Sequence, residues 1–273
     1  MTAHWSTFDL VIHRRSYPSG NQPFIPQPRK AASAPRLHHD KALEVSGFPR
    51  PYFLPFSGYD VRQRDGDQQM TATCVVMGGR RVLFVMAIDA EYGPHLQARI
   101  TPLMTGVGPV EAALAMAVTL DRMAQAGTLP DLVVSLGSAG SRVGMLGEVY
   151  QVASVSWRDM DASRLGFTKG VTPLIDHPVD IPLVTPLEIR ALRLSTGANV
   201  VGGEEYGAID ADMVDMETFA IARACQRFDV PLMGLRGISD GPGELEDMLG
   251  WTQLLSLIDE KLAVAVDALG EAL

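Results

Sequence analysis

Cysteines and long apolar runs are scarce in this sequence, and each scarcity excludes a class of protein. The chain contains only two cysteines, Cys74 and Cys225, which cannot build a disulfide framework or a cysteine-based metal site. No stretch approaches the roughly 18 to 20 uninterrupted apolar residues that a membrane-spanning helix needs. At the N-terminus, Leu10 to Ile12 is too short to be the apolar core of a signal peptide. We therefore expect a soluble, cytoplasmic protein that does not bind membranes.

Positive charge is scarce in the larger part of the chain. Residues 77–273 hold 14 Lys and Arg against 26 Asp and Glu, a net charge of −12, whereas residues 1–76 carry a net charge of +3. Nucleic-acid binding needs a positive surface that displaces counterions, so this acidic part disfavours it. Its two histidines, His95 and His177, have no partner pattern for a metal or a catalytic triad. We expect a small-molecule ligand, and neither a metal nor a cofactor.

Residues 1–76 also differ in pattern. Eight prolines lie between positions 18 and 55, and no helical or strand period is sustained. Such a segment cannot bury enough apolar area to offset the entropy of ordering it. It is either a disordered extension, or translation starts at Met70 or Met77 and the upstream residues are misassigned; a targeting peptide is a third interpretation. We predict that the folded domain spans residues 77–273.

Strands and helices alternate from Arg80 onward. Apolar runs that are typical of buried strands cover 81–88, 131–136, 149–155, 191–195 and 230–238. Apolar residues at helical spacing predict helices over 110–126, 213–227 and 251–269. This order indicates an α/β fold of three layers (αβα) around a central mixed, largely parallel sheet. Ligands of such sheets bind beyond the carboxyl ends of the strands, so polar residues that follow strands are the candidate site.

Four segments place acids or small residues where a predicted strand ends or a helix begins. They are Ala87–Glu91, Gly137–Gly140, Val214–Glu217 and Gly237–Asp240. Taken alone, each has an ordinary structural explanation, because acids suit helix starts and turns. Glycines likewise suit a tight turn from strand to helix. The informative observation is that all four occur together, in this order and spacing.

Together the four segments resemble the nucleoside phosphorylase/nucleosidase superfamily and, more narrowly, the methylthioadenosine/S-adenosylhomocysteine nucleosidases. The resemblance covers about residues 80–270 and is most specific in the block VDMETFAIARACQRFDVPLMGLRGISD, residues 214–240. It implies a nucleoside phosphorylase-like fold, an adenine nucleoside as ligand and a homodimer. The run Gly106-Val107-Gly108-Pro109 resembles the glycine turn of the family, and Glu111 in the third glycine position argues against a dinucleotide-binding fingerprint.

The resemblance also implies roles in hydrolysing 5′-methylthioadenosine and S-adenosylhomocysteine. Asp240 matches the general acid that protonates N7 of the leaving purine, and Glu91 matches the glutamate that polarises the attacking water. Two acids with opposite proton-transfer roles follow the general logic of glycoside hydrolysis. Glu217 matches the glutamate that binds the ribose hydroxyls. The remaining residues that match the substrate site of the family are Ser138, Ala139, Gly140, Asn199, Val200, Met216 and Ser239.

Three departures from the family concern the pocket. The segment between Glu91 and Thr105 is shorter than in the usual member and leaves no room for an extra strand pair. Asn199 stands where the family usually has an aromatic residue, and Asp215 stands where it commonly has a glutamate. These departures bear on substrate preference more than on the type of reaction.

Two other functions stay open at this point. A phosphorylase would need a phosphate site, typically with glycines and arginines in the loop after the first strand. That loop reads Asp89-Ala90-Glu91-Tyr92-Gly93-Pro94, which is acidic and without arginine. A non-catalytic nucleoside-binding protein could have the same fold, although the joint presence of Glu91, Glu217 and Asp240 argues against it.

Overall fold

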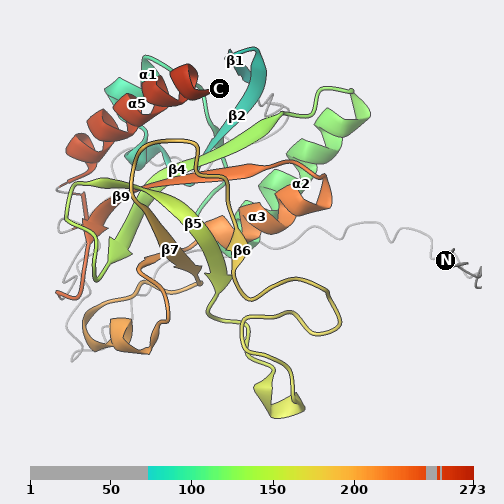
Figure 1. Ribbon diagram of the computed structural model, residues 1–273, viewed down its shortest axis with the longest axis vertical. Helices are drawn as coiled ribbons and strands as arrows, with labels where there is room; N and C mark the ends of the chain where they lie inside the picture. Colours follow the sequence, from blue (N-terminus) through green and yellow to red (C-terminus); the bar gives the residue numbers. More distant parts are fainter. Residues whose placement is uncertain (1–72, 244–250, 253) are drawn as a thin grey trace, which may run out of the picture. The chain divides into compact units, whose positions relative to one another are not determined.

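The computed structural model describes residues 73–243, 251–252 and 254–273, which form a nine-stranded sheet flanked by helices (Figure 1). The strands are β1 (Val75–Met77), β2 (Arg80–Met86), β3 (Leu103–Met104), β4 (Leu132–Ser141), β5 (Val149–Trp157), β6 (Ile181–Pro182), β7 (Ala191–Thr196), β8 (Met213–Asp215) and β9 (Leu232–Asp240). The α-helices are α1 (Pro94–Gln97), α2 (Pro109–Gln125), α3 (Thr218–Arg227) and α5 (Leu255–Ala272). Short 3-10 helices are η2 (Asp89–Glu91), η3 (Ser163–Leu165) and η4 (Gly203–Ala208).

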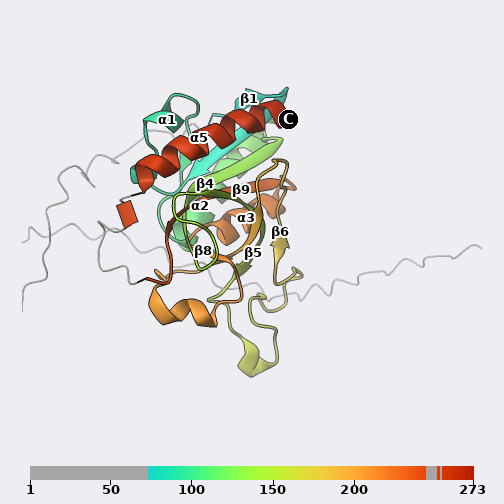
Figure 2. The same ribbon diagram turned by 60° about the vertical axis from the view of Figure 1, so that its left-hand side comes forward.

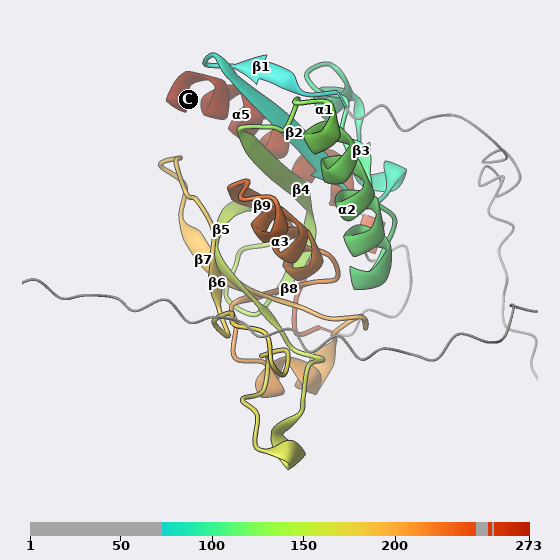
Figure 3. The ribbon, with the colours of Figure 1, turned by 90° about the vertical axis from the view of Figure 1, so that its right-hand side faces the viewer.

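The apolar run of β2 explains why helices cover both faces of the sheet. Successive side chains of a strand point to opposite faces. Leu83 and Val85 therefore join the core under α2 and α3, whereas Phe84 and Met86 join the core under α5. Figure 3 shows α5 behind the strands and α2 and α3 in front of them, and Figure 2 shows α1 beside α5. This arrangement confirms the predicted three-layer αβα fold.

The sheet is mixed, as predicted. Parallel pairs join β2 to β3 and β4, β4 to β9, β5 to β7 and β7 to β8, while the other four pairs are antiparallel. Five strands form a closed ring, in which β4 pairs with β9, β9 with β5, β5 with β7, β7 with β8, and β8 again with β4. In this ring Gly140 of β4 lies between Val214 of β8 and Asp240 of β9. The ring thus brings three of the four segments that the sequence singled out to one place.

The prediction of one long helix over residues 213–227 is wrong at its start. Residues Met213–Asp215 form β8, and α3 begins only at Thr218. β8 pairs with both β4 and β7, so sheet hydrogen bonds replace helical ones. The carboxylate of Asp215 then accepts a hydrogen bond from the N–H of Thr218 (3.0 Å), the first residue of α3. The apolar residues at 213–216 fit the spacing of a helix, so the sequence pattern did not indicate the boundary between β8 and α3.

The Gly137–Gly140 segment is not the turn that the sequence suggested. β4 continues through it to Ser141, because β9 is long enough to pair with it up to Asp240. Neither glycine has a positive φ. A register shift between Ala139 and Gly140 leaves Ser239 as an extra residue on β9. Such bulges re-aim the side chains that follow, and this one precedes Asp240.

The sheet begins at Val75, two residues before the domain start predicted at residue 77. β1 pairs antiparallel with β2, with Val75 opposite Val82. The interpretations of residues 1–76 as a disordered extension or a misassigned start fall on residues 1–72, which lie outside the described part, and stay predictions. Among the helices that the structure describes, none has both the length and the apolar character needed to cross a membrane.

A buried aspartate ties the segment that follows β2 to the C-terminal helix. Asp259 of α5 accepts hydrogen bonds from the N–H groups of His95 (2.9 Å) and Leu96 (3.0 Å) at the start of α1. Gly93 leaves room for this contact, because a Cβ there would lie 2.5 Å from an oxygen of Asp259. The short connection between Glu91 and Thr105 is therefore anchored, even though it lacks an extra strand pair.

Candidate active site

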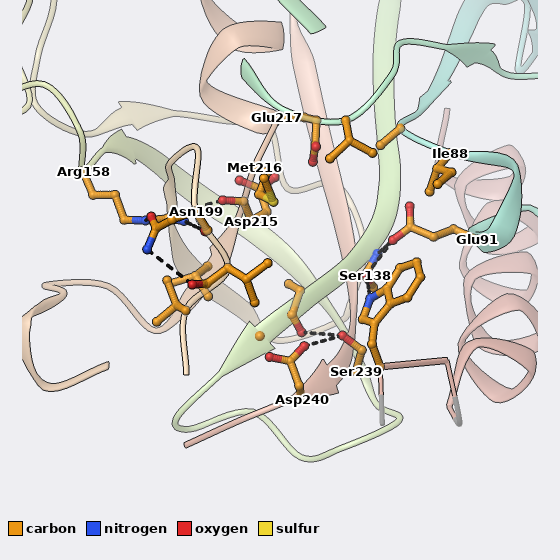
Figure 4. Close-up of a pocket in the computed structure, with 18 residues that line it drawn as sticks. Ile88, Glu91, Ser138, Arg158, Asn199, Asp215, Met216, Glu217, Ser239 and Asp240 are labelled. Carbon is orange, nitrogen blue, oxygen red and sulfur yellow. Dashed lines mark hydrogen bonds between the residues drawn. The ribbon is translucent and has the colours of Figure 1, made fainter. Parts of the chain in front are cut away.

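All ten residues that the sequence singled out line one cavity of about 390 Å³. They come from η2, β4, the segment after β7, the junction of β8 and α3, and the end of β9, as Figure 4 shows for the labelled side chains. Three acids face this cavity from different elements: Glu91, Glu217 and Asp240. The lining also includes residues that the sequence did not assign to the substrate site: Ala87, Ile88, Val107, Arg158, Val201, Val214, Asp215 and Trp251.

Glu91 is held by Ser138. One carboxylate oxygen, Oε1, accepts hydrogen bonds from the Ser138 N–H (2.8 Å) and from the Ser138 hydroxyl (2.5 Å). Burial raises the pKa of Glu91, and the two hydrogen bonds oppose that shift because they favour the ionised form. The result is a buried carboxylate with a fixed orientation, which is suited to accept a proton from a water molecule.

Asp240 is oriented by two hydroxyl groups. Its Oδ1 accepts a hydrogen bond from Ser239 (2.6 Å), and its Oδ2 accepts one from Tyr206 (3.1 Å). Burial and the neighbouring Asp240 carboxylate raise the pKa of Tyr206, so its phenol stays protonated as a donor. Gly140 makes the arrangement possible, since a Cβ there would lie 2.1 Å from the Tyr206 oxygen and 2.6 Å from Asp240 Oδ2.

Glu217 lies directly before α3, on the side of the cavity where Figure 4 shows Met216 and Asp215. Its Oε1 accepts a hydrogen bond from the Gly108 N–H (2.8 Å), within the glycine turn before α2. Gly108 has a φ of 94°, a conformation that favours glycine. Burial, followed by the like charge of Asp215, raises the pKa of Glu217 to about 7. Its charge therefore changes near neutral pH.

This raised pKa predicts a pH-dependent stability difference between the wild type and Glu217→Gln. The folded protein keeps the Glu217 proton at pH values where the unfolded chain, with a pKa of 4.5, has lost it. The free energy of unfolding that Glu217 contributes should thus fall as the pH rises from 4.5 to about 7, and then level off. Thermal unfolding from pH 4.5 to 8.5 should show the variant gaining Tm relative to the wild type over this range. A constant Tm difference would contradict the assignment.

A buried ion pair supports the floor of the cavity. Arg236 of β9 donates from Nη2 to Asp215 Oδ2 (3.1 Å) and to the Ser135 hydroxyl (2.9 Å). Asp215 Oδ1 also accepts a hydrogen bond from the Thr196 hydroxyl (2.6 Å). Because both charges are buried, removing either partner would leave the other uncompensated, which typically costs about 3–5 kcal/mol. Asp215, which stands where the resembling family commonly has a glutamate, is thus part of a hydrogen-bond network that ties β4, β7, β8 and β9 together.

Arg158 and Asn199 lie together at the end of the cavity opposite Glu91 (Figure 4). The Arg158 guanidinium donates to the main-chain oxygens of Ser195 (2.6 Å), Asp215 (3.0 Å) and Asn199 (2.8 Å). Burial lowers the pKa of Arg158. These contacts fix the main chain at Asn199, which stands where the resembling family usually has an aromatic residue. In this protein the Arg158 guanidinium supports that segment.

Sequence reasoning missed three residues that orient or support the predicted site. The sequence patterns assign no site role to Tyr206 in η4 or to Arg158, and they place Trp251 only within a predicted helix. Nothing in the local pattern of these residues distinguishes them. Asp159, next to Arg158, accepts a hydrogen bond from the Ala198 N–H (2.6 Å) in the loop after β7. His177 forms only local hydrogen bonds, to residues 172 and 178.

Within the described residues, no group of three or more His, Cys, Asp or Glu is arranged to hold a metal ion. The acids that line the cavity can themselves support proton transfer. A carboxyl held by two hydroxyls and a second carboxylate held by a serine can move protons in opposite directions. The half-buried acid beside the glycine turn adds negative charge, which favours a ligand that develops positive charge during reaction.

Comparison with solved structures establishes the fold. The structure is similar to that of a 5′-methylthioadenosine/S-adenosylhomocysteine nucleosidase from Colwellia psychrerythraea in complex with adenine, with a TM-score of 0.60 and 21% identity over 73% of this chain and 97% of the other. It is also similar to the futalosine hydrolase of Helicobacter pylori, with a TM-score of 0.59 and 20% identity over 70% of this chain and 97% of the other. The predicted nucleoside phosphorylase-like fold is thereby confirmed.

Sequence comparison places the chain more narrowly. The Phosphorylase superfamily model matches residues 187–268, which include β8, α3 and β9. A 5′-methylthioadenosine/S-adenosylhomocysteine nucleosidase from Anoxybacillus flavithermus is 29% identical over 178 residues, which cover 58% of this chain and 74% of that protein. The nucleosidase of the same description from Actinobacillus succinogenes is 31% identical over 162 residues, which cover 52% of this chain and 68% of that protein. The chain therefore belongs to the 5′-methylthioadenosine/S-adenosylhomocysteine nucleosidase family.

Proposed function

We propose that this protein hydrolyses the N-glycosidic bond of 5′-methylthioadenosine and S-adenosylhomocysteine, releasing adenine and the 5-thioribose product. The observation that carries the proposal is that Glu91, Glu217 and Asp240 line one cavity, each with its own hydrogen-bond partner. Relatives that share the pattern are described as nucleosidases for these substrates. A similar solved structure holds adenine, the base that the reaction would release.

The reaction that fits this cavity uses the two catalytic acids in opposite senses. As the general acid, Asp240 delivers a proton to N7 of the purine, so that the base leaves as neutral adenine and the C1′–N9 bond breaks. The Glu91 carboxylate accepts a proton from water, whose oxygen forms the new bond to C1′. Glu217 binds the ribose hydroxyls, and its negative charge favours the oxocarbenium-like sugar of the transition state.

Hydrolysis fits the cavity better than phosphorolysis. A phosphate anion entering near Glu91 would meet an acidic loop and three acids, and like charges in a partly buried site repel strongly. Arg158, the cation in the lining, is at the far end and donates to three main-chain oxygens. Water needs no such cationic site. A non-catalytic binding protein, in turn, would have no use for a separately oriented acid and base.

Adenine release tests the proposal directly. The full chain should release adenine from 5′-methylthioadenosine and from S-adenosylhomocysteine in phosphate-free buffer, and the two rates rank the substrates. The rate should not change when phosphate is added. A rate that rises in proportion to phosphate would establish a phosphorylase instead. A folded protein that binds adenine but releases none from either substrate would favour the binding function.

We also propose that the protein acts as a homodimer through α2. Val110, Leu114 and Val118 follow each other at helical spacing on α2 and are 67%, 58% and 48% exposed. Val107, 49% exposed, continues this apolar face to the rim of the cavity. A contiguous apolar face of this kind is typical of a contact with another chain, and a two-fold dimer would cover it with its own copy. We propose further that the protein acts in the cytoplasm, as the sequence predicts, and that it serves methionine salvage.

Leu114→Asp should disrupt this dimer, because a carboxylate from each copy would be buried in the contact without a partner. We expect the wild type to sediment as a dimer at micromolar concentration and the variant as a folded monomer. Leu165→Asp is the control, since Leu165 is a 78% exposed leucine in η3, away from α2. Monomeric wild-type protein, or equal behaviour of the two variants, would contradict the proposed contact.

A further inference from the structure

Trp251 makes a side-chain hydrogen bond that reaches Glu91 through one intermediate. The indole N–H of Trp251 donates to the Ser138 hydroxyl oxygen at 3.1 Å. That hydroxyl lies 2.5 Å from Glu91 Oε1. Trp251 precedes α5 and lies 113 residues from Ser138 along the chain, so only the fold brings them together. All three side chains line the cavity.

The chemistry of the three groups gives this series of hydrogen bonds a single direction. An indole N–H is a donor only, so the Ser138 oxygen must accept from Trp251. The serine hydroxyl has a single hydrogen, and Glu91 Oε1 is the acceptor that lies within hydrogen-bond distance of it. Trp251 therefore selects the rotamer in which the Ser138 hydrogen points at Glu91. Without that donor, the hydroxyl is free to rotate and to accept a hydrogen bond from another neighbour instead.

The two oxygens of the Glu91 carboxylate are thereby made unequal. Oε1 accepts both the Ser138 N–H and the Ser138 hydroxyl. Oε2 receives no hydrogen bond from any residue that the structure describes, and it lies over Gly137, where a Cβ would come within 3.0 Å of it. We propose that Trp251 is a positioning residue that acts through Ser138 to hold Glu91 with Oε2 available to water. This inference rests on the proposed hydrolysis, in which Glu91 is the base.

The charged groups around Glu91 do not replace this hydrogen bond. Arg236 of β9 favours the ionised carboxylate from a distance, while Asp215 of β8 and Glu217 at the start of α3 oppose it. None of the three is hydrogen-bonded to Glu91 in the described structure. The Ser138 N–H and the Ser138 hydroxyl donate directly to Glu91, and the direction of the hydroxyl depends on Trp251.

Trp251→Phe removes the indole N–H but keeps an aromatic ring in the cavity wall. We expect kcat at neutral pH to fall about five- to tenfold, as the loss of one hydrogen bond in a charged network typically gives. KM should change less than about twofold, because an aromatic ring is kept in the lining of the cavity. The acid side of the pH–kcat profile should move to higher pH, since the ionised form of Glu91 loses support.

Trp157→Phe is the matched control. The Trp157 indole N–H has no hydrogen-bond partner among the described residues, and its ring stacks on Phe219 in the core. It should therefore keep the wild-type pH profile. A double-mutant cycle with Ser138→Ala separates the proposed route from a general effect of the ring. Trp251→Phe should have no additional effect on kcat once Ser138 is alanine. Equal losses in both backgrounds, or a Trp251→Phe enzyme with full kcat, would overturn the inference.

A measurement that needs no catalytic turnover tests the hydrogen bond from Trp251 independently of the proposed function. In ¹⁵N-labelled full-length protein, the indole N–H signal of Trp251, assigned from Trp251→Phe, should shift in Ser138→Ala and in Glu91→Gln. The Trp157 signal should stay in place. Wild-type protein that releases no adenine, but whose Trp251 signal responds in this way, refutes the proposed function and leaves the directed hydrogen bond established. An active enzyme whose Trp251 signal ignores Ser138→Ala refutes the inference alone.

Discussion

Asp240→Asn should lower kcat by about a thousandfold, within the range of 10² to 10⁴ that a general acid contributes. The amide cannot deliver a proton to N7, so adenine would have to leave as an anion. The substitution keeps the shape of the side chain. Ser239 and Tyr206 are hydroxyl groups that can both donate and accept, so they can adapt to the amide. Folding and adenine binding should therefore survive.

Single-turnover adenine release checks this prediction, together with the Kd for adenine and the Tm of the variant. Asp267→Asn is the control for the same chemical change. Asp267 lies near the C-terminal end of α5, and its carboxylate forms a surface ion pair with Arg99. Replacing this carboxylate by an amide should leave kcat unchanged. If Asp240→Asn kept more than about a tenth of wild-type kcat, Asp240 would not be the acid.

Glu91→Gln should lower kcat by about a hundredfold or more, the typical contribution of a general base. The amide oxygen can still accept from Ser138, so the position of the side chain and the Kd for adenine should be kept. What is lost is the ability to accept a proton from water. Because burial raises the pKa of Glu91, wild-type kcat should fall as the pH decreases through that raised value.

The pH profile provides the discriminating measurement for Glu91. In Glu91→Gln the residual rate should lack the acid limb that Glu91 contributes in the wild type. Glu111→Gln is the control, because Glu111 is an exposed acid in the first turn of α2. A Glu91→Gln enzyme with the wild-type profile would assign water activation to another group, such as Glu217.

The sequence was sufficient to predict that Glu91, Glu217 and Asp240 belong to one site, and all three line the same cavity. Glu91 lies in the segment after a buried strand, and Glu217 and Asp240 lie in one contiguous block, so the resemblance carried by these segments singled out all three; their roles stay predictions. The three-layer αβα fold likewise followed from apolar runs and helical spacing. Such patterns reflect chemistry and burial that are local along the chain.

Features that depend on contacts between distant segments could not be predicted. Tyr206 reaches Asp240 only because β4, β8 and β9 meet at Gly140, and Trp251 reaches Ser138 across 113 residues. The error over residues 213–227 has the same origin. Met213 and Val214 fit a helical period, but pairing with two neighbouring strands outweighed it. Local preference yields to tertiary hydrogen bonding in such short segments.

The most direct test of hydrolysis is the fate of the water oxygen. The full chain would be incubated with 5′-methylthioadenosine in H₂¹⁸O containing phosphate, and the sugar product analysed at once by mass spectrometry. The proposed mechanism predicts free 5-methylthioribose that carries one ¹⁸O at C1, together with an equal amount of unlabelled adenine. A sugar 1-phosphate as the product, or no cleavage by the folded protein, would contradict the proposed function.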